Sequence, residues 1–430
     1  MAGLELGANN NNNSSTVSRP FVVSAVVLAF AGSLVGSVWM MALFGVQAGG
    51  TYMAFPLHRA LQIDGFLTVL IMGIGYMIVP RFRNSTLPST KLAYVSLALV
   101  LASIALSVAS TVSPGSDDDN MQALSSAARL AGVAIFSGMV FWMLRIRPRL
   151  LGLADYFIGL SVATLLVLGV IRMSGAEVAS ALSEVQVLLL FPLLMIFGVE
   201  YKTMPSFLGF IRPRKKAAMA SFALAVAAAA LGIPSALLDS APLSAAFNAA
   251  LLGSAAAFAH SLYVFGGFDN SEILRLISGE KKARYTYTMA YSRLSFLFLY
   301  AGIAFAAAFF SAPSSDLSYI SYDLAIHLTA IGFIGTTIAL YLPLMLPAIT
   351  GRQVRFASFS HAPVLLLVAA LAVRAAGDAA LTYGLLLQPL SYLLMASGWM
   401  VVTALAAFIV MVRRSMKKGT AATNIDASIT

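Results

Sequence analysis

The chain has 430 residues, of which 60% are hydrophobic and only 10% are charged, and it contains no cysteine. A soluble domain carries about 25% charged residues to cover its water-facing surface, so this composition excludes an ordinary soluble fold, and the lack of thiols excludes disulfides, thiolate metal sites and a covalently attached c-type haem. In so apolar a chain, the net charge of +10 indicates basic cytoplasmic loops and argues against nucleic acid as a partner.

Long apolar runs without alternation predict an all-α polytopic membrane helix bundle in a lipid bilayer, because backbone amides in hydrocarbon must be paired within each segment. Residues 1–19, with the run Asn9 to Asn13, are too polar to bury a core and are predicted to be a disordered tail. Residues 20–412 form the transmembrane domain, and residues 413–430 form a basic and then polar C-terminal tail. Twelve spans are predicted in the domain, near 20–46, 55–80, 91–113, 122–144, 153–173, 184–207, 217–238, 243–267, 287–311, 321–348, 358–376 and 385–412.

The basic residues show which side of the membrane each loop occupies. With these spans, 22 of the 27 lysines and arginines fall on one side. By the positive-inside rule that side is cytoplasmic, and it also holds both termini. We therefore expect a multi-pass protein of a prokaryotic plasma membrane.

Histidine is costly inside a membrane and therefore informative there. Of the four histidines, His58 in the second span and His327 in the tenth are expected at similar depth in the outer half. Two imidazoles on different helices are the ligands that a bis-His haem requires. His260 and His361, both expected in the inner half, are weaker candidates for a second metal site. Each histidine has an alternative role, a hydrogen bond to a neighbouring carbonyl or hydroxyl.

Arg59, Arg374 and Asp64 are three charged residues of the predicted membrane spans that bear on a haem site or a proton path. Arg59 and Arg374 are expected near the outer surface, where a guanidinium either binds haem propionates with a forked contact or extends to water. Asp64, six residues after His58, either carries protons or pairs with a basic group, and the structural role is favoured.

The second and tenth spans carry a resemblance to known families. In the second span, His58 is followed seven residues later by Gly-Phe, then by Gly and Tyr, and the span ends in Pro-Arg. This pattern resembles the second helix of the haem–copper oxidase subunit I superfamily and of the NnrS family of haem- and copper-containing membrane proteins. In the tenth span, His327 precedes a Gly-rich stretch, and Thr-Gly-Arg follows at 350–352, which is similar to a segment of NnrS.

The resemblance implies a haem–copper oxidase subunit I-like bundle in which His58 and His327 ligate a b-type haem. It also implies Arg374 as a partner of the haem propionates, and copper as a further metal. The chain departs from the oxidase pattern because spans 6 and 7 hold no histidine and Ala325 stands two positions before His327. It therefore does not supply the three histidines of a copper or non-haem iron centre, and we do not expect a haem–copper oxygen reductase.

Three functions remain open at this stage. The first is a membrane cytochrome that acts in electron transfer or in the response to nitric oxide and nitrosative stress. The second is a non-catalytic haem-bearing or scaffold subunit that associates with redox partner subunits. The third is a haem-free transporter in which Asp64, Glu200 and Arg293 line a path. Enzyme activity of the chain alone stays undecided.

Overall fold

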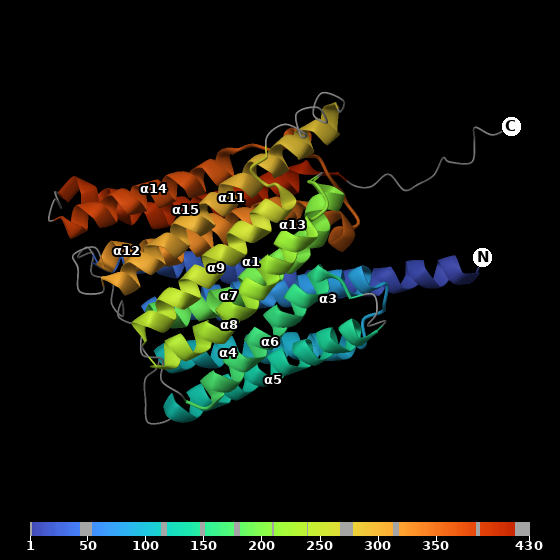
Figure 1. The fold of residues 1–430 in the computed structure, drawn as a ribbon, viewed down its shortest axis with the longest axis horizontal. Coiled ribbons are helices and arrows are strands. Elements are labelled where there is room, and N and C mark those ends of the chain that lie inside the picture. The colour runs from blue at the N-terminus through green and yellow to red at the C-terminus, as the bar shows by residue number, and fades with distance from the viewer. Residues whose placement is uncertain are drawn as a thin grey trace.

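The computed structural model describes residues 2–43, 54–112, 118–146, 151–175, 181–208, 210–238, 240–266, 278–312, 318–383 and 388–417. These residues form an all-α bundle of long helices that run side by side (Figure 1). In chain order the elements are α1 (Ala2–Leu43), α2 (Ala54–Arg59), η2 (Ala60–Leu67), α3 (Thr68–Arg83), α4 (Thr90–Val112), α5 (Asp118–Arg145), α6 (Leu153–Met173), α7 (Ala181–Phe207), α8 (Lys215–Leu238), α9 (Ala241–Leu262), α11 (Gly279–Ser311), α12 (Ser318–His327), η4 (Leu328–Gly335), α13 (Thr336–Thr350), β1 (Gln353–Val354), η5 (Phe356–Ser358), α14 (Ala362–Thr382), α15 (Gln388–Ser415) and β2 (Met416–Lys417).

The number of membrane spans agrees with the sequence prediction. The described residues contain twelve helical segments long and apolar enough to cross a membrane. The second span joins α2, η2 and α3, and the tenth joins α12, η4 and α13. A multi-pass protein in a lipid bilayer is therefore the class that this fold defines.

The first helix of the structure includes residues 2–19 of the predicted N-terminal tail. Helix α1 is continuous from Ala2, and its apolar part, Thr16–Ala42, forms the first span. In Figure 1 the first turns of α1 project beyond the bundle. A polar segment can continue a helix in this way because each added residue extends an existing turn, without the cost of a new nucleus.

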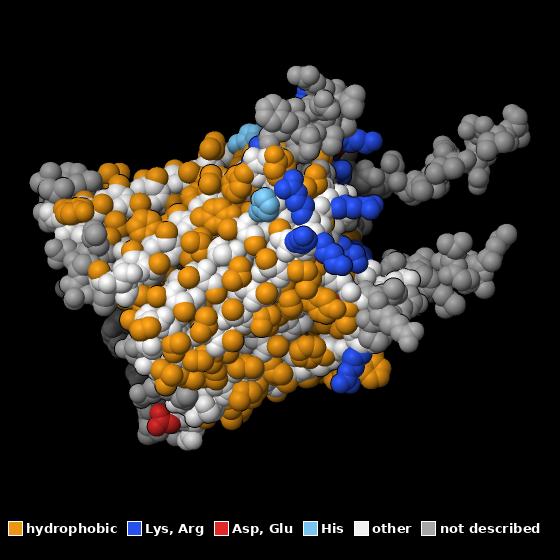
Figure 2. Space-filling view, in the orientation of Figure 1, with side chains coloured by type: hydrophobic (Ala, Val, Ile, Leu, Met, Phe, Trp, Pro, Cys, Tyr) orange, Lys and Arg blue, Asp and Glu red, His pale blue; other side chains and the backbone are white. Residues whose placement is uncertain are grey.

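The two ends of the bundle differ in charge. Helix α1 begins and α15 ends at the same end (Figure 1), and lysine and arginine side chains gather there on the face shown in Figure 2. We call this the basic end. It also carries the one pair of strands in the described residues, in which β1 pairs antiparallel with β2. The last residues of the predicted C-terminal tail, 418–430, lie outside the described residues.

Three spans form the centre of the bundle. In the most apolar stretches of Ala54–Arg83, Leu182–Ser206 and Ser318–Thr350, 78%, 83% and 67% of the residues are buried, against at most 44% in any other span. Phe197 of α7 stacks on Phe258 of α9 at 4.4 Å between ring centroids and meets Phe333 of η4 edge to face. Aromatic packing of this kind fixes the position of the tenth span against α7.

Candidate functional site

A large cavity runs lengthwise beside these central spans. Its volume is about 520 Å³, and its walls come from α1, the second span, α7, the tenth span, α14 and α15. Along α1 it extends from Val22 to Met40, about 27 Å at ~1.5 Å per residue, which is close to the thickness of the hydrocarbon core. Cavities of this size commonly hold a cofactor or another small molecule.

His58 and His327 both line this cavity, as the prediction of a shared site requires. The Nδ1 atom of His58 lies 2.7 Å from the carbonyl oxygen of Gly32 in α1. A carbonyl accepts only, so Nδ1 carries the proton and Nε2 keeps its lone pair for a metal. His58 also lies within electrostatic range of His327.

His327 is held in the same tautomer. Its Nδ1 lies 2.9 Å from the carbonyl oxygen of Asp323 and 3.2 Å from the Asp323 carboxylate. That carboxylate accepts a forked pair of hydrogen bonds from Arg374, through Nε and through Nη2 at 2.6 Å. Histidine ligands of metals nearly always donate their second ring nitrogen to a carbonyl or carboxylate, and such partners raise the basicity of the ligand. The two histidines therefore have the surroundings of metal ligands.

A turn of π-helix accompanies each histidine. The π-helical segment η2 begins two residues after His58, and η4 begins directly after His327. A π-turn holds one more residue than an α-turn, so it changes the direction in which the preceding side chains point. Such turns are rare and frequently lie at functional sites. The two π-helical segments were not predicted from the sequence.

The two arginines predicted to bind propionates both line the cavity, but each already has a carboxylate partner. Arg59, half-buried, pairs with Glu184 of α7. Arg374 is buried rather than at the end of its helix. Helix α14 ends at Thr382, beyond the predicted limit of 376, so Arg374 lies eight residues before the end of the helix. A propionate at either arginine would join an existing ion pair.

A network of ion pairs connects the second, fourth, fifth and sixth spans toward the end of the bundle opposite the basic end. The carboxylate of Asp64 accepts hydrogen bonds from Arg129 at 2.6 Å and from Arg172 at 2.8 Å. Arg172 also donates to Glu184 at 3.1 Å, and Glu184 pairs with Arg59. The structural role favoured for Asp64 is thus confirmed. The partners of Asp64 were not predicted, although the sequence carries them as charged residues in the fourth, fifth and sixth spans.

His260 and His361 are not brought together. Both are exposed, and Nδ1 of His361 lies 2.5 Å from the hydroxyl of Tyr291. Helix α9, which carries His260, packs on α7, α8 and α11, whereas α14 packs on α12, η4 and α15. Within the described part of the chain, no group of three or more His, Cys, Asp or Glu side chains is placed to hold a metal ion.

Arg293 of α11 donates hydrogen bonds to two backbone carbonyls. Its Nε donates to the carbonyl of Val264 at 3.0 Å, and its Nη2 donates to that of Gly266 at 2.8 Å. These carbonyls follow the end of α9, where orphan acceptors need donors.

Comparison with known proteins leaves the family open. No protein-family model matches the chain, and no curated protein is found to be similar to it. The fold therefore defines the class, an all-α multi-pass membrane protein, and the resemblance to NnrS and to haem–copper oxidase subunit I stays a hypothesis that depends on the second and tenth spans.

Proposed function

We propose that this chain is an NnrS-like b-type membrane cytochrome that binds haem through His58 and His327 and acts in electron transfer or in the response to nitric oxide. One observation carries the proposal. Two histidines from different central spans line the same large apolar cavity, and in both of them the hydrogen bond at Nδ1 leaves Nε2 free. We place the protein in the plasma membrane of a prokaryote with both termini cytoplasmic.

A bound haem would supply one-electron chemistry, or gas binding if one axial position stays open. Hydrogen bonds within the protein orient the two histidines for this role. The carbonyls of Gly32 and Asp323 fix the two tautomers, and Arg374 holds the Asp323 carboxylate beside His327. The mostly apolar walls keep water from the site and lower the local dielectric constant, which strengthens every charge interaction there.

The contacts of the polar side chains favour this function over a transporter. Asp64 is held by two arginines and Arg293 by two carbonyls, so two of the three residues expected along a transport path already have partners. Co-purification of redox subunits with the chain would favour the alternative function, a haem-bearing or scaffold subunit of a respiratory membrane complex.

The test is a reduced-minus-oxidised optical spectrum of the purified, detergent-solubilised chain. We expect a low-spin b-type α-band that is lost in His58→Ala and in His327→Ala. His260→Ala is the matched control, because His260 is exposed and outside the cavity, and it should keep the band. A wild-type protein without haem, or a band that survives in both cavity variants, would overturn the proposal.

A further inference from the structure

A second, smaller cavity lies directly beside the large one. Its volume is about 60 Å³, and Leu67, Leu70, Ile338 and Leu342 line both cavities. This space is enough for a few water molecules. Only apolar side chains are shared by the two cavities, so a change of charge in one acts on the other with little screening.

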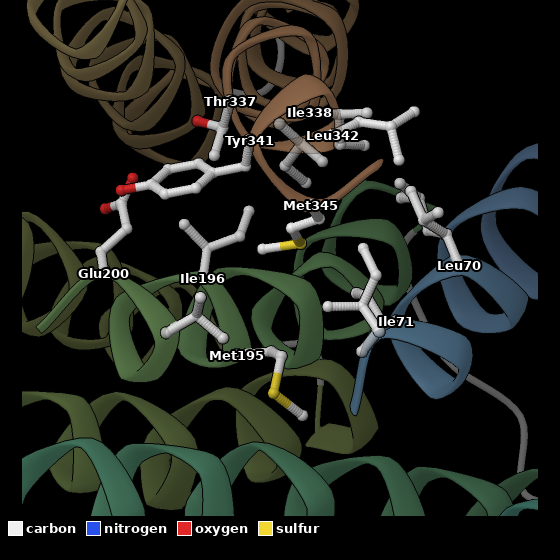
Figure 3. A pocket seen from close by; sticks show the side chains of 14 residues that line it. Leu70, Ile71, Met195, Ile196, Glu200, Thr337, Ile338, Tyr341, Leu342 and Met345 are labelled. Carbon is white, nitrogen blue, oxygen red and sulfur yellow. The ribbon is translucent and has the colours of Figure 1, made fainter. Parts of the chain in front are cut away.

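A single carboxyl group faces the small cavity. Glu200 of α7 reaches toward Tyr341 of α13, and their oxygens lie next to each other in Figure 3. Glu200 is only 1% exposed. Neither of its carboxyl oxygens, nor the Tyr341 hydroxyl, forms a hydrogen bond of good geometry within the described residues.

Among the described residues, no lysine, arginine or histidine forms an ion pair with Glu200. Tyr341 is the one other titratable side chain among the residues that line the small cavity. Two other buried carboxylates differ, because Asp155 pairs with Arg83 and Asp323 pairs with Arg374. Asp378 of α14 is also buried without an ion pair in the described residues, but it lines neither cavity. Burying an ionised carboxylate without a cation costs several kcal/mol, and such a group becomes neutral instead.

We propose that Glu200 is a proton-binding site, a neutral carboxylic acid that releases its proton when the large cavity gains a positive charge and takes it back when that charge is removed. Release breaks the O–H bond of the carboxyl group, leaves a carboxylate and passes the proton through water in the small cavity to the bulk solvent, and no electron moves in this step. Tyr341 is a positioning residue whose phenol oxygen lies next to the carboxyl group.

The coupling to a charge rests on the proposed function, because a one-electron change of a cofactor supplies that charge. The inference that the Glu200 carboxyl group is protonated does not depend on a bound cofactor. The two parts therefore need separate measurements.

The first measurement is infrared spectroscopy of the full chain in H₂O and D₂O. A protonated carboxyl group gives a C=O band outside the amide region. The spectra are recorded in an Asp378→Asn background, which removes the other buried carboxyl without an ion pair in the described residues, and we expect the remaining band to disappear in Glu200→Gln. In Tyr341→Phe it should shift in frequency, because the phenol no longer reaches the acid. Glu184→Gln is the control, since Glu184 is paired with arginines, and it should keep the band. A band unchanged in Glu200→Gln would overturn the neutral acid.

The second measurement is the midpoint potential of the bound haem as a function of pH. Reduction removes a positive charge, so Glu200 takes up a proton, and the potential should fall as the pH rises. The limit is about 59 mV per pH unit, since a tenfold change in proton activity corresponds to 59 mV for one electron. In Glu200→Gln the dependence should disappear. A midpoint potential that depends equally on pH in the wild type and in Glu200→Gln would overturn the coupling between Glu200 and the haem. A wild-type protein without haem would overturn both this coupling and the proposed function. It would leave the protonated state of Glu200 untouched.

Discussion

At Gly36 the backbone of α1 comes so close to His58 that no side chain fits between them. A Cβ atom at this position would lie 2.5 Å from Nδ1 of His58, the atom that contacts Gly32. We predict that Gly36→Ala displaces the imidazole and lowers haem affinity by about 10–100-fold, the usual effect of disturbing a partner of a metal ligand. A haem titration monitored by absorbance measures this. Gly138→Ala is the matched control, because a Cβ there meets nothing within 4 Å.

The buried pair between Asp323 and Arg374 supports a second prediction for single residues. Asp323→Asn removes the anion but leaves the guanidinium buried, so we expect a loss of about 3–5 kcal/mol in stability, the usual result of breaking one side of a buried pair. Unfolding followed by tryptophan fluorescence measures it. The double variant Asp323→Asn with Arg374→Gln should lose less than the single one. A single variant as stable as the wild type would show that the pair contributes nothing.

At the scale of the element, the π-helical turn of η2 determines where His58 points. Deleting Ala60 should close this turn to an α-turn and rotate the six residues of α2 by about 100° around the helix axis, since one α-helical residue corresponds to that rotation. His58 would then leave the cavity, and the haem spectrum should be lost. Deleting Thr86, in the loop after α3, removes one residue without changing any helix and should leave the spectrum intact. A normal spectrum after deletion of Ala60 would show that the π-turn has no part in the site.

The π-turns also show why part of the site could not be predicted from the sequence. The twelve spans could be predicted because hydrophobicity and length alone decide them. A shared cavity for His58 and His327 was predictable from their similar depth. In contrast, a π-turn depends on packing against neighbouring helices and has no residue signature, and the burial of Arg374 depended on where α14 ends, which composition does not fix.

For the whole molecule, the large cavity links the stability of the bundle to its ligand. The cavity lies among six of the twelve spans, so a ligand that fills it contacts both the central and the peripheral helices. Anything that binds only the folded state stabilises it, by about 4 kcal/mol when the free ligand is at a thousand times its dissociation constant. Protein prepared under haem limitation should therefore melt at a lower temperature than loaded protein, and added haem should restore the melting temperature. The double variant His58→Ala with His327→Ala should show no such rise. An equal rise in that variant would mean that haem stabilises the bundle without these histidines, and the cavity would then bind it by apolar contact alone.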